Sequence, residues 1–352
     1  MIILLAILTS LVPAVVWAVF VYTRDRYEPE PKSLIVRLFL WGMLAGPWAS
    51  GLNILIAQFL SPAVDATQRA GALPATVALL LAMVALSALN EETMKYVVVS
   101  SRVRGDPSFT EPVDGIIYMS TAALGFAAGE NFVYIVNTYY GVVSNNGPAA
   151  RAFVDAFLIT APLRALLSTL GHVTWSGIVG HHLSEHVLRK ASGRSLVGGV
   201  LFAGAIHTAF NLPLFLQELG LPIAWISWLV WIFGLERYIT LFGHALQESP
   251  FRPRTAAANA DASDGFRRRR AHQLPVLGAI TLVGGGLAAL ASALRAPDSL
   301  SFTLGFLALM AAVAFNRFNW RCPNCYAYLG RAGMDPKRCP TCGALLAATP
   351  SR

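Results

Sequence analysis

Repeated apolar stretches of about 20 residues constrain the fold of this chain more than any other feature. A helix needs about 20 mostly apolar residues to cross the hydrocarbon core of a membrane. Of the 352 residues, 55% are hydrophobic and 13% are charged, whereas a soluble domain carries about 25% charged residues. The sequence therefore predicts an all-α polytopic membrane protein with about nine transmembrane helices. The expected spans are 2–22, 34–60, 73–99, 115–138, 152–183, 196–216, 220–245, 275–294 and 299–316.

Two of these spans have unusual features. The stretch 2–22 lacks a positively charged start, so we expect a retained membrane helix rather than a cleaved signal peptide. The span 152–183 is longer than one crossing needs and contains Pro162, so we expect this helix to be tilted or broken there. No internal repeat is evident.

The numbers of Lys and Arg residues alternate between successive connections. From residue 23 onward the connections carry 3, 1, 2, 1, 3, 0, 6 and 1 of them. By the positive-inside rule, the N-terminus lies outside the cell membrane and the C-terminus in the cytoplasm. The net charge of +8 and the run RRRR at 267–270 then reflect cytoplasmic topology beside anionic membrane lipid. Nucleic-acid binding is not expected.

A polar, small and basic segment, residues 248–274, interrupts the apolar pattern. Its composition is typical of a flexible cytoplasmic linker. It separates a transmembrane body of about seven helices, residues 1–247, from a two-helix membrane module, residues 275–317. The remaining residues, 318–352, form a soluble cytoplasmic tail.

All four cysteines lie in this tail, in the motifs CPNC and CPTCG, with 13 residues between the two motifs. Two such knuckles can close a tetrahedral zinc site with four cysteine ligands, although the separation is slightly short. The reducing cytosol argues against disulfides. Four thiolates leave no open position for water, so the predicted zinc is structural and the tail is a zinc ribbon. Its expected ligands are Cys322, Cys325, Cys339 and Cys342.

Ionisable and amide side chains recur at similar depth on four consecutive predicted helices. A charged group inside the bilayer costs about 2.5–3.5 kcal/mol, so their recurrence needs a reason. Residues four apart share one helix face, and several of these residues are spaced in that way. They can meet in one cavity between the cytoplasmic half and the middle of the membrane. The residues are Glu91, Glu92 and Lys95, then Glu130 and Asn131, then Arg164, Ser168 and His172, then His207 and Asn211.

These residues also have structural interpretations. Glu91 and Lys95 are four apart and can form an ion pair within one helix. A single histidine can join two helices by a hydrogen bond, and Asn211 can serve helix packing. A transporter or proton relay, which also uses buried Glu and His, remains an alternative. Four further histidines lie near helix ends and are expected at the membrane interface: His181, His182, His186 and His244.

The chemistry that this cluster supports best is hydrolysis. The adjacent carboxylates Glu91 and Glu92 would titrate as a unit, and one of them can take a proton from water as it attacks a peptide carbonyl. Nearby imidazoles can stabilise the oxyanion, or Glu and His together can hold a metal that activates the water. The residues leave the need for a catalytic metal open. They favour a metal-independent mechanism slightly, because carboxylates outnumber imidazoles and no two histidines of the cluster lie four apart.

Three motifs resemble those of the PrsW-type intramembrane proteases, which are related to the CAAX prenyl protease and Abi group. EETMK at 91–95 fits E-E-x-x-K, FAAGE at 126–130 fits F-x-x-x-E, and HTAFN at 207–211 fits H-x-x-x-N/D. The stretches RDRYEPEPK and PVDGIIYMSTAALGFAAGENFVY are also similar to this family. The resemblance covers roughly residues 20–215 and preserves the order of the motifs.

The resemblance implies an intramembrane endopeptidase that cleaves membrane-anchored proteins, with anti-sigma factors as one substrate class. It implies catalytic roles for Glu91 and Glu92, with Glu130 and His207 in the same site. His172 joins them because of its depth and spacing, and because the family usually has a histidine in this helix. Asn211 would orient a neighbouring group. The last two helices and the zinc ribbon depart from the family core. A catalytically inactive scaffold with a docking ribbon therefore remains a further alternative, and the oligomeric state is not predicted.

Overall fold

A computed structural model describes residues 1–25, 27–221, 223–252, 256–293, 308, 311–330 and 336–346. The chain divides into two compact units, Met1–Leu241 and Phe242–Arg352. In these described ranges the secondary structure is helical apart from two isolated β-bridges in the second unit. The predicted all-α class is therefore confirmed.

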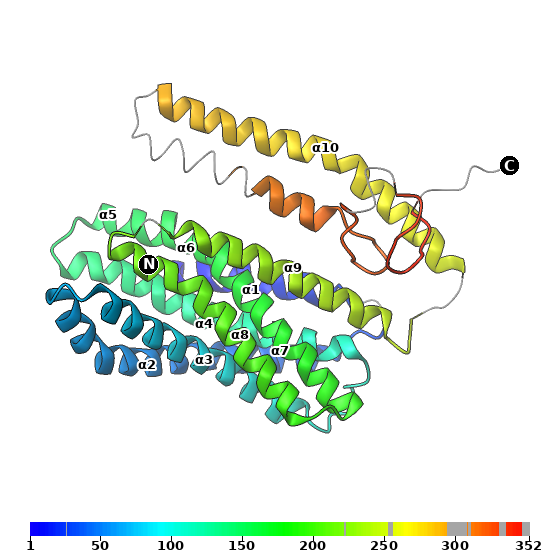
Figure 1. The fold of residues 1–352 in the computed structure, drawn as a ribbon, viewed down its shortest axis with the longest axis horizontal. Coiled ribbons are helices and arrows are strands. Elements are labelled where there is room, and N and C mark those ends of the chain that lie inside the picture. Colours follow the sequence, from blue (N-terminus) through cyan, green and yellow to red (C-terminus); the bar gives the residue numbers. More distant parts are fainter. Residues whose placement is uncertain are drawn as a thin grey trace. The chain divides into compact units, whose positions relative to one another are not determined.

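The first unit is a bundle of long helices that lie side by side (Figure 1). One of them, Ala149–Arg189, runs without interruption through α5, α6 and α7 but contains two π-helical segments, η1 and η2. The last helix, α9, crosses the boundary into the second unit. The elements are α1 (Ile2–Tyr22), α2 (Lys32–Arg69), α3 (Leu73–Val103), α4 (Pro112–Ser144), α5 (Ala149–Phe153), η1 (Val154–Thr160), α6 (Ala161–Leu163), η2 (Arg164–Ser168), α7 (Thr169–Arg189), α8 (Gly193–Glu218) and α9 (Trp225–Gln247).

Five helical stretches are long and apolar enough to cross a membrane: α1, α2, α3, the run Ala149–Arg189, and α8. The helices α4 and α9 have 33 and 23 residues and are not among these five. Every residue of α4 from Pro112 to Asn131 is buried in the protein. The chain is thus a membrane protein, and the number of crossings stays a prediction. The expected span 275–294 falls at the end of α10, and most of the span 299–316 lies outside the described residues.

Glycines allow α2 and α4 to cross with their backbones almost in contact. A Cβ atom at Gly42 would lie 2.0 Å from a backbone oxygen of α4, and one at Gly125 would lie 1.9 Å from a backbone oxygen of α2. Gly46 and Gly129 repeat this contact one turn further along, at 2.6 and 2.3 Å. Both helices therefore present a G-x-x-x-G face, the pattern that permits close packing of membrane helices. The crossing fixes the position of Glu130, the next residue of α4.

The irregularity expected near Pro162 takes the form of π-helical turns. Segments η1 and η2 flank the short α6, which contains Pro162. Proline lacks the N–H that an α-helix needs, and a wider π turn accommodates the missing hydrogen bond without breaking the helix. The helix continues through this region without a break. Segment η2 begins at Arg164, whose side chain reaches into the centre of the bundle.

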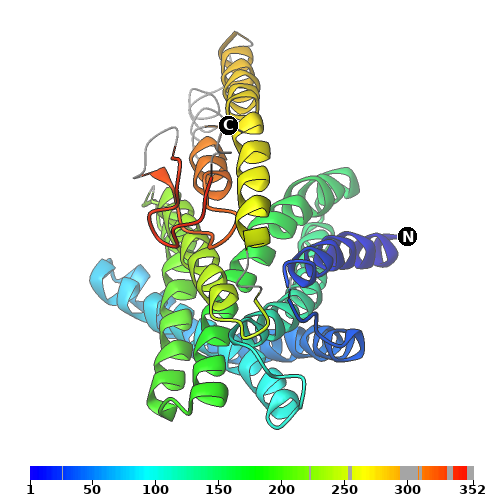
Figure 2. The same ribbon diagram turned by 90° about the vertical axis from the view of Figure 1, so that its right-hand side faces the viewer.

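The second unit contains α10 (Ala256–Ala293), a short helix at 311–319, and the cysteine-containing tail. Figure 2, like Figure 1, shows the short helix beside α10. Gln273 donates a hydrogen bond to Asn316 at 2.7 Å, and Asn319 donates one to the carbonyl of Arg269 at 2.8 Å. The flexible linker expected at 248–274 is wrong for residues 256–274, which are helical. Alanine and arginine, which dominate this segment, are strong helix formers.

Candidate active site

A cavity of about 670 Å³ opens among α2, α3, α4, α8 and the long helix Ala149–Arg189. Five of the residues predicted for the site line it: Glu91, Glu130, His172, His207 and Asn211. Glu92 does not line the cavity and is fully buried behind its wall. The structure thus brings together residues of four helices that the sequence placed at similar depth.

Glu91 of α3 is the carboxylate that faces the cavity. Its Oε1 accepts a hydrogen bond from Nδ2 of Asn53 at 2.8 Å. Its Oε2 is buried and has no hydrogen-bond partner. This oxygen lies 4.0 Å from Nδ1 of His172 and 3.9 Å from Nε2 of His207. One carboxylate oxygen and two imidazole nitrogens therefore converge on a common point.

His207 of α8 is held by the carboxylate of Glu92. Its Nδ1 lies 3.2 Å from Oε1 of Glu92, and because a carboxylate only accepts, Nδ1 carries the proton. Its Nε2 then has a free lone pair directed toward Glu91. Trp175 stacks on the imidazole with 5.7 Å between ring centroids and 19° between the planes, so the ring orientation is fixed from a second side.

His172 of α7 lies between a cation and an anion. Nζ of Lys95 lies 2.9 Å from Nδ1, and Oε2 of Glu130 lies 2.9 Å from Nε2. An ammonium group can only donate and a carboxylate can only accept. These partners assign the proton to Nε2 and the lone pair to Nδ1, the nitrogen that faces Glu91.

Glu92 acts as a buried anchor. Its Oε1 pairs with Nζ of Lys95 at 2.6 Å, with both side chains fully buried, and its Oε2 accepts a hydrogen bond from Ser176 at 2.8 Å. The alternative interpretation of an ion pair between Glu91 and Lys95 is therefore wrong, because Lys95 pairs with Glu92 instead. Both oxygens of Glu92 are used by the protein, which separates its role from that of its neighbour.

Glu130 of α4 is paired with Arg164. Nη2 of Arg164 lies 2.6 Å from Oε2 of Glu130, and its Nε donates to Oδ1 of Asn131 at 2.8 Å. Asn131 in turn donates to Oγ1 of Thr169 at 3.0 Å. Arg164 also lines the cavity, so a guanidinium group stands close to the converging Glu and His side chains.

Several residues of the site were not predicted from the sequence. Asn53 binds Glu91, and Asn90 donates to Oδ1 of Asn53 at 2.8 Å. Ser176 and Trp175 position Glu92 and His207. An asparagine inside an apolar helix is a signal that could have identified Asn53 and Asn90, but the contact itself depends on how α2 packs against α3.

Two predicted features lie at the edge of the site or outside it. Asn211 lines the cavity one turn beyond His207. His182 and His186 lie outside the cavity, near the end of α7, where they contact Ser195 and the carbonyl of Ala191. These two contacts join the α7 end to the start of α8 and agree with the expected location near a helix end.

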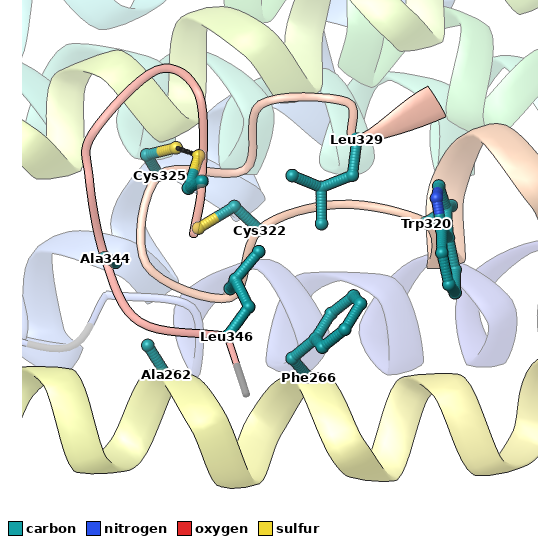
Figure 3. Packing of buried hydrophobic residues seen from close by; sticks show 9 residues of the cluster. Ala262, Phe266, Trp320, Cys322, Cys325, Leu329, Ala344 and Leu346 are labelled. Atoms are coloured by element: carbon teal, nitrogen blue, oxygen red, sulfur yellow. Dashed lines mark hydrogen bonds between the residues drawn. The ribbon is translucent and has the colours of Figure 1, made fainter. Parts of the chain in front are cut away.

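The four cysteines form a separate centre in the second unit. Figure 3 shows cysteines of this centre above α10, beside Leu329, Leu346 and Phe266. The Sγ atoms of one pair are 3.5 Å apart and those of another are 3.8 Å apart. Thiolates at about 2.3 Å from a tetrahedral zinc would lie about 3.8 Å from one another. The cysteine cluster can therefore hold a metal ion. The pairs are Cys325 with Cys339 and Cys322 with Cys342.

The two cysteine turns repeat one another, although no repeat was predicted. Each residue of the first turn has its counterpart 17 positions later, as RCPNCYAYL and RCPTCGALL show. The amide of Cys322 donates to the carbonyl of Ala327, and that of Cys339 donates to the carbonyl of Ala344, both at 2.9 Å. Two matching β-bridges close the turns: Arg321 with Tyr328 and Arg338 with Leu345.

In a helical membrane protein, a buried carboxylate and two imidazoles around a cavity are groups that can activate a water for hydrolysis. Residues 30–235 match the protein family described as PrsW family intramembrane metalloprotease. The chain belongs to this family, so the resemblance predicted from the motifs is confirmed. The matched range contains all six residues predicted for the active site and excludes the cysteine tail.

Curated relatives extend this finding. The chain is 34% identical over 173 residues to Protease PrsW of Geobacillus kaustophilus (strain HTA426), covering 49% of this chain and 63% of that protein. It is 23% identical over 243 residues to Protease PrsW of Clostridioides difficile (strain 630), covering 68% and 92% of the two chains. It is 24% identical over 236 residues to Protease PrsW of Bacillus subtilis (strain 168), covering 65% of this chain and 91% of that protein. No solved structure matches this chain.

Proposed function

We propose that this protein is an intramembrane endopeptidase that hydrolyses membrane-anchored proteins at the centre formed by Glu91, His172 and His207. The observation that carries the proposal is the unpartnered, buried Oε2 of Glu91, which faces a ring nitrogen of each histidine at 3.9–4.0 Å. A buried carboxylate oxygen without a donor is costly, so this arrangement implies that water, substrate or a metal ion belongs there.

The donor set fits a catalytic metal ion. One carboxylate oxygen and two imidazole nitrogens are the ligands found in many catalytic zinc sites, and their atoms lie within 4.8 Å of one another. Because Nδ1 of His172 accepts a hydrogen bond from Nζ of Lys95 at 2.9 Å, metal binding there would require Lys95 to give up this contact. The partners of the imidazoles also fit, since metal-binding histidines usually donate their other N–H to a carboxylate. Here Glu92 takes the proton of His207 and Glu130 takes that of His172. A bound metal would lower the pKa of a coordinated water and polarise the peptide carbonyl.

This proposal departs from the slight preference for a metal-independent mechanism. That preference rested on the excess of carboxylates over imidazoles and on the absence of two histidines four apart on one helix. The second ground matters only if a single helix supplies both ligands. The two imidazoles come from α7 and α8 instead. The description of the family as an intramembrane metalloprotease supports the same conclusion for this chain.

The other residues of the cavity would prepare the reaction. Asn53 orients the carboxylate of Glu91 through its Oε1. Arg164 places positive charge beside the centre, where it can stabilise the oxyanion that forms when the carbonyl is attacked. Asn211 offers an amide on the cavity wall near His207, suited to hold a peptide group of the substrate.

The substrate class follows from the surroundings of the centre. A cavity between membrane helices suits a single membrane-spanning segment that enters from the bilayer, and we propose anti-sigma factors as one such class. We further propose that the C-terminus is cytoplasmic, on the distribution of Lys and Arg, and that the four-cysteine cluster holds a structural zinc ion. A reporter fused after Arg270 would contradict the proposed topology if it scored as extracytoplasmic.

The central experiment measures cleavage and metal content together. Purified full-length protein in detergent is incubated with single-span membrane proteins, and its metals are measured by mass spectrometry. We expect the parent protein to hold two transition-metal ions per chain, such as zinc, and to cleave a membrane-protein substrate. Glu91→Gln should lose one ion and all cleavage, whereas Asp65→Asn, an exposed acid of α2, should change neither.

Each alternative gives a different result. Cleavage by a parent that holds a single ion, bound only by the cysteines, would contradict the catalytic metal but keep the peptidase. Ion transport across sealed vesicles without any cleavage would favour a transporter. A parent and a Glu91→Gln variant that are equally inactive toward all membrane substrates would favour the inactive scaffold.

A further inference from the structure

Three polar side chains line the catalytic cavity about one helical turn away from the proposed catalytic centre. Each of them lies four residues from one of the three side chains that converge there, on the same helical stretch. The pairs are Ser87 with Glu91, Ser168 with His172, and Asn211 with His207. Residues four apart share one face of a helix, so each of the three faces the same cavity as its neighbour. We call Ser87, Ser168 and Asn211 the polar tier.

The directions of the helices place the polar tier on one side of the catalytic centre. Helix α3 meets α8 at Glu91 and His207, which lie 3.9 Å apart. Toward its start, α3 packs against the end of α8 through Leu80 and Leu216, so these two helices are antiparallel. Helices α7 and α8 are joined by residues 190–192 alone, and such a short connection makes them antiparallel as well. A step of four residues toward the start of α3, the start of α7 or the end of α8 therefore leads in the same direction.

The side chains of the polar tier are available to a ligand. Within the described part of the first unit, the hydroxyls of Ser87 and Ser168 and the carboxamide of Asn211 form no hydrogen bond with the protein. Hydroxyls in helices often return to a carbonyl of their own helix, as that of Thr208 does to Gly204 at 2.7 Å. The three residues are half-buried, and none of their polar atoms is sealed from the cavity. A bound substrate can therefore reach all three.

A membrane-spanning substrate segment must leave the helical form before one of its peptide bonds can be cut. In an α-helix each carbonyl accepts a hydrogen bond from the N–H four residues further on, and the surrounding side chains shield it. Once the segment opens, its N–H and C=O groups need new partners, because an unsatisfied backbone group is costly inside a membrane. Hydroxyl and carboxamide groups both donate and accept hydrogen bonds. The polar tier can therefore pair with either kind of backbone group.

We propose that the polar tier binds the main chain of an unwound substrate segment about two residues away from the scissile bond. This inference rests on the proposed peptidase function. One helical turn rises about 5.4 Å, and an extended chain advances about 3.3 Å per residue, so the polar tier and the catalytic centre are about two residues apart along an extended substrate. The preferred substrates are then membrane segments that open readily at this position, through residues of low helix propensity such as glycine.

The test uses full-length protein in detergent and synthetic single-span peptides whose cleavage site is mapped by mass spectrometry. In each peptide of a series, an ester replaces one amide on either side of the scissile bond. The ester removes one N–H and weakens the adjoining carbonyl as an acceptor. We expect the ester about two residues from the scissile bond to raise KM about tenfold for the parent, as for the loss of one partner of a buried hydrogen bond. Esters further away should have little effect.

Two serine variants test the protein side of this contact. Ser87→Ala and Ser168→Ala should each raise KM about tenfold on the all-amide peptide, with little change in kcat, because binding to the main chain is lost equally from ground state and transition state. Their metal content should equal that of the parent. At least one variant should be indifferent to the ester that impairs the parent, since the two changes remove the same hydrogen bond. Ser100→Ala, a buried serine of α3 outside the cavity, is the matched control and should behave as the parent does.

The outcomes separate this inference from the proposed function. A parent that cleaves, with a KM that neither serine variant nor any ester changes, would overturn the role of the polar tier and keep the peptidase. Effects of ester and variant that simply multiply in both serine variants would also overturn it, because they would assign the serines a structural role without contact to the substrate main chain. A parent that cleaves no membrane-spanning peptide or protein would overturn both.

Discussion

The catalytic centre and the cysteine centre differ in how the chain brings their donor atoms together. Glu91, His172 and His207 come from α3, α7 and α8, which lie far apart in the sequence. The four cysteines come from two tight turns between positions 322 and 342 that share one backbone pattern. The first centre is therefore a product of helix packing, and the second is a product of local turns.

This difference predicts different relations between metal and fold. The helices of the first unit are packed through backbone contacts such as Gly42 against α4, which do not depend on a metal ion. The cysteine tail buries few apolar side chains, among them Leu329 and Leu346, and small domains of this kind commonly need their metal to fold. Loss of the ligands should thus cost activity in the first unit and structure in the second.

The largest effect is expected for Glu91→Gln. The substitution keeps the shape of the side chain but removes its charge, so cleavage should fall by about 10³-fold or more, as for loss of a catalytic carboxylate. Circular dichroism and the unfolding temperature should stay close to those of the parent. Initial rates on a membrane-protein substrate provide the measurement. His207→Ala should be nearly as severe.

The adjacent residue supplies the contrast. Glu92→Gln leaves the buried ammonium group of Lys95 without its carboxylate, and an unpaired buried charge costs about 3–5 kcal/mol. We therefore expect a protein that unfolds at a lower temperature as well as one that is less active. If Glu92→Gln were fully stable and Glu91→Gln unfolded, the roles assigned to the two glutamates would be reversed.

The second prediction concerns the cysteine tail. Replacing Cys339 and Cys342 by Ser should release one metal ion and make the tail sensitive to protease, because the two turns lose their common centre. Cleavage activity should remain within a few-fold of the parent. Limited proteolysis followed by mass spectrometry checks the first point. A protease-resistant tail without metal would show that its apolar contacts suffice, and would remove the contrast between the two centres.

The third prediction tests helix packing as the scaffold of the catalytic centre. Gly42→Ala and Gly125→Ala would each place a methyl group about 2 Å from a backbone oxygen, and such overpacking costs about 1–3 kcal/mol. Gly51→Ala on α2 and Gly141→Ala on α4 are matched controls, since nothing lies within 4 Å of a Cβ at either position. Thermal unfolding should separate the two pairs. Equal unfolding temperatures for all four variants would contradict the close crossing of α2 and α4.

The smallest effect is expected for Asn53→Leu. This change removes the donor that holds Oε1 of Glu91, and loss of such an orienting contact typically lowers activity or metal affinity by about 10–100-fold. We expect about tenfold in kcat with little change in KM. Asn137→Leu, another amide of the cavity wall, is the control. An equal loss in both variants would indicate a general effect of polarity rather than orientation of Glu91.

Sequence reasoning found the residues whose chemistry is unusual for their surroundings. Glu91, Glu130, His172 and His207 are costly inside a membrane, so their presence alone was informative, and the order of the motifs gave the family. The cysteines were equally readable, because both halves of their centre are local. Even the expected irregularity near Pro162 was present, as π turns rather than a break.

What could not be predicted depends on contacts between helices. Spacing along α3 allowed Lys95 to pair with either glutamate, and the choice of Glu92 follows from the place of His172 and Ser176 on α7. The contact of Asn53 with Glu91 depends on the crossing of α2 and α3. The helical state of residues 256–274 was missed because small and basic residues suit both linkers and helices, and packing against the neighbouring segment decides between them.

The twofold repeat in the cysteine tail has a consequence for stoichiometry. Each turn supplies two of the four sulfurs, so a chain that carries only the first turn, Cys322 and Cys325, holds half of a tetrahedral site. Half-sites of one kind are complementary to one another, as in any arrangement with twofold symmetry. Two such shortened chains could therefore share a single ion. The metal site, which lies within one tail in the full chain, would then link two molecules.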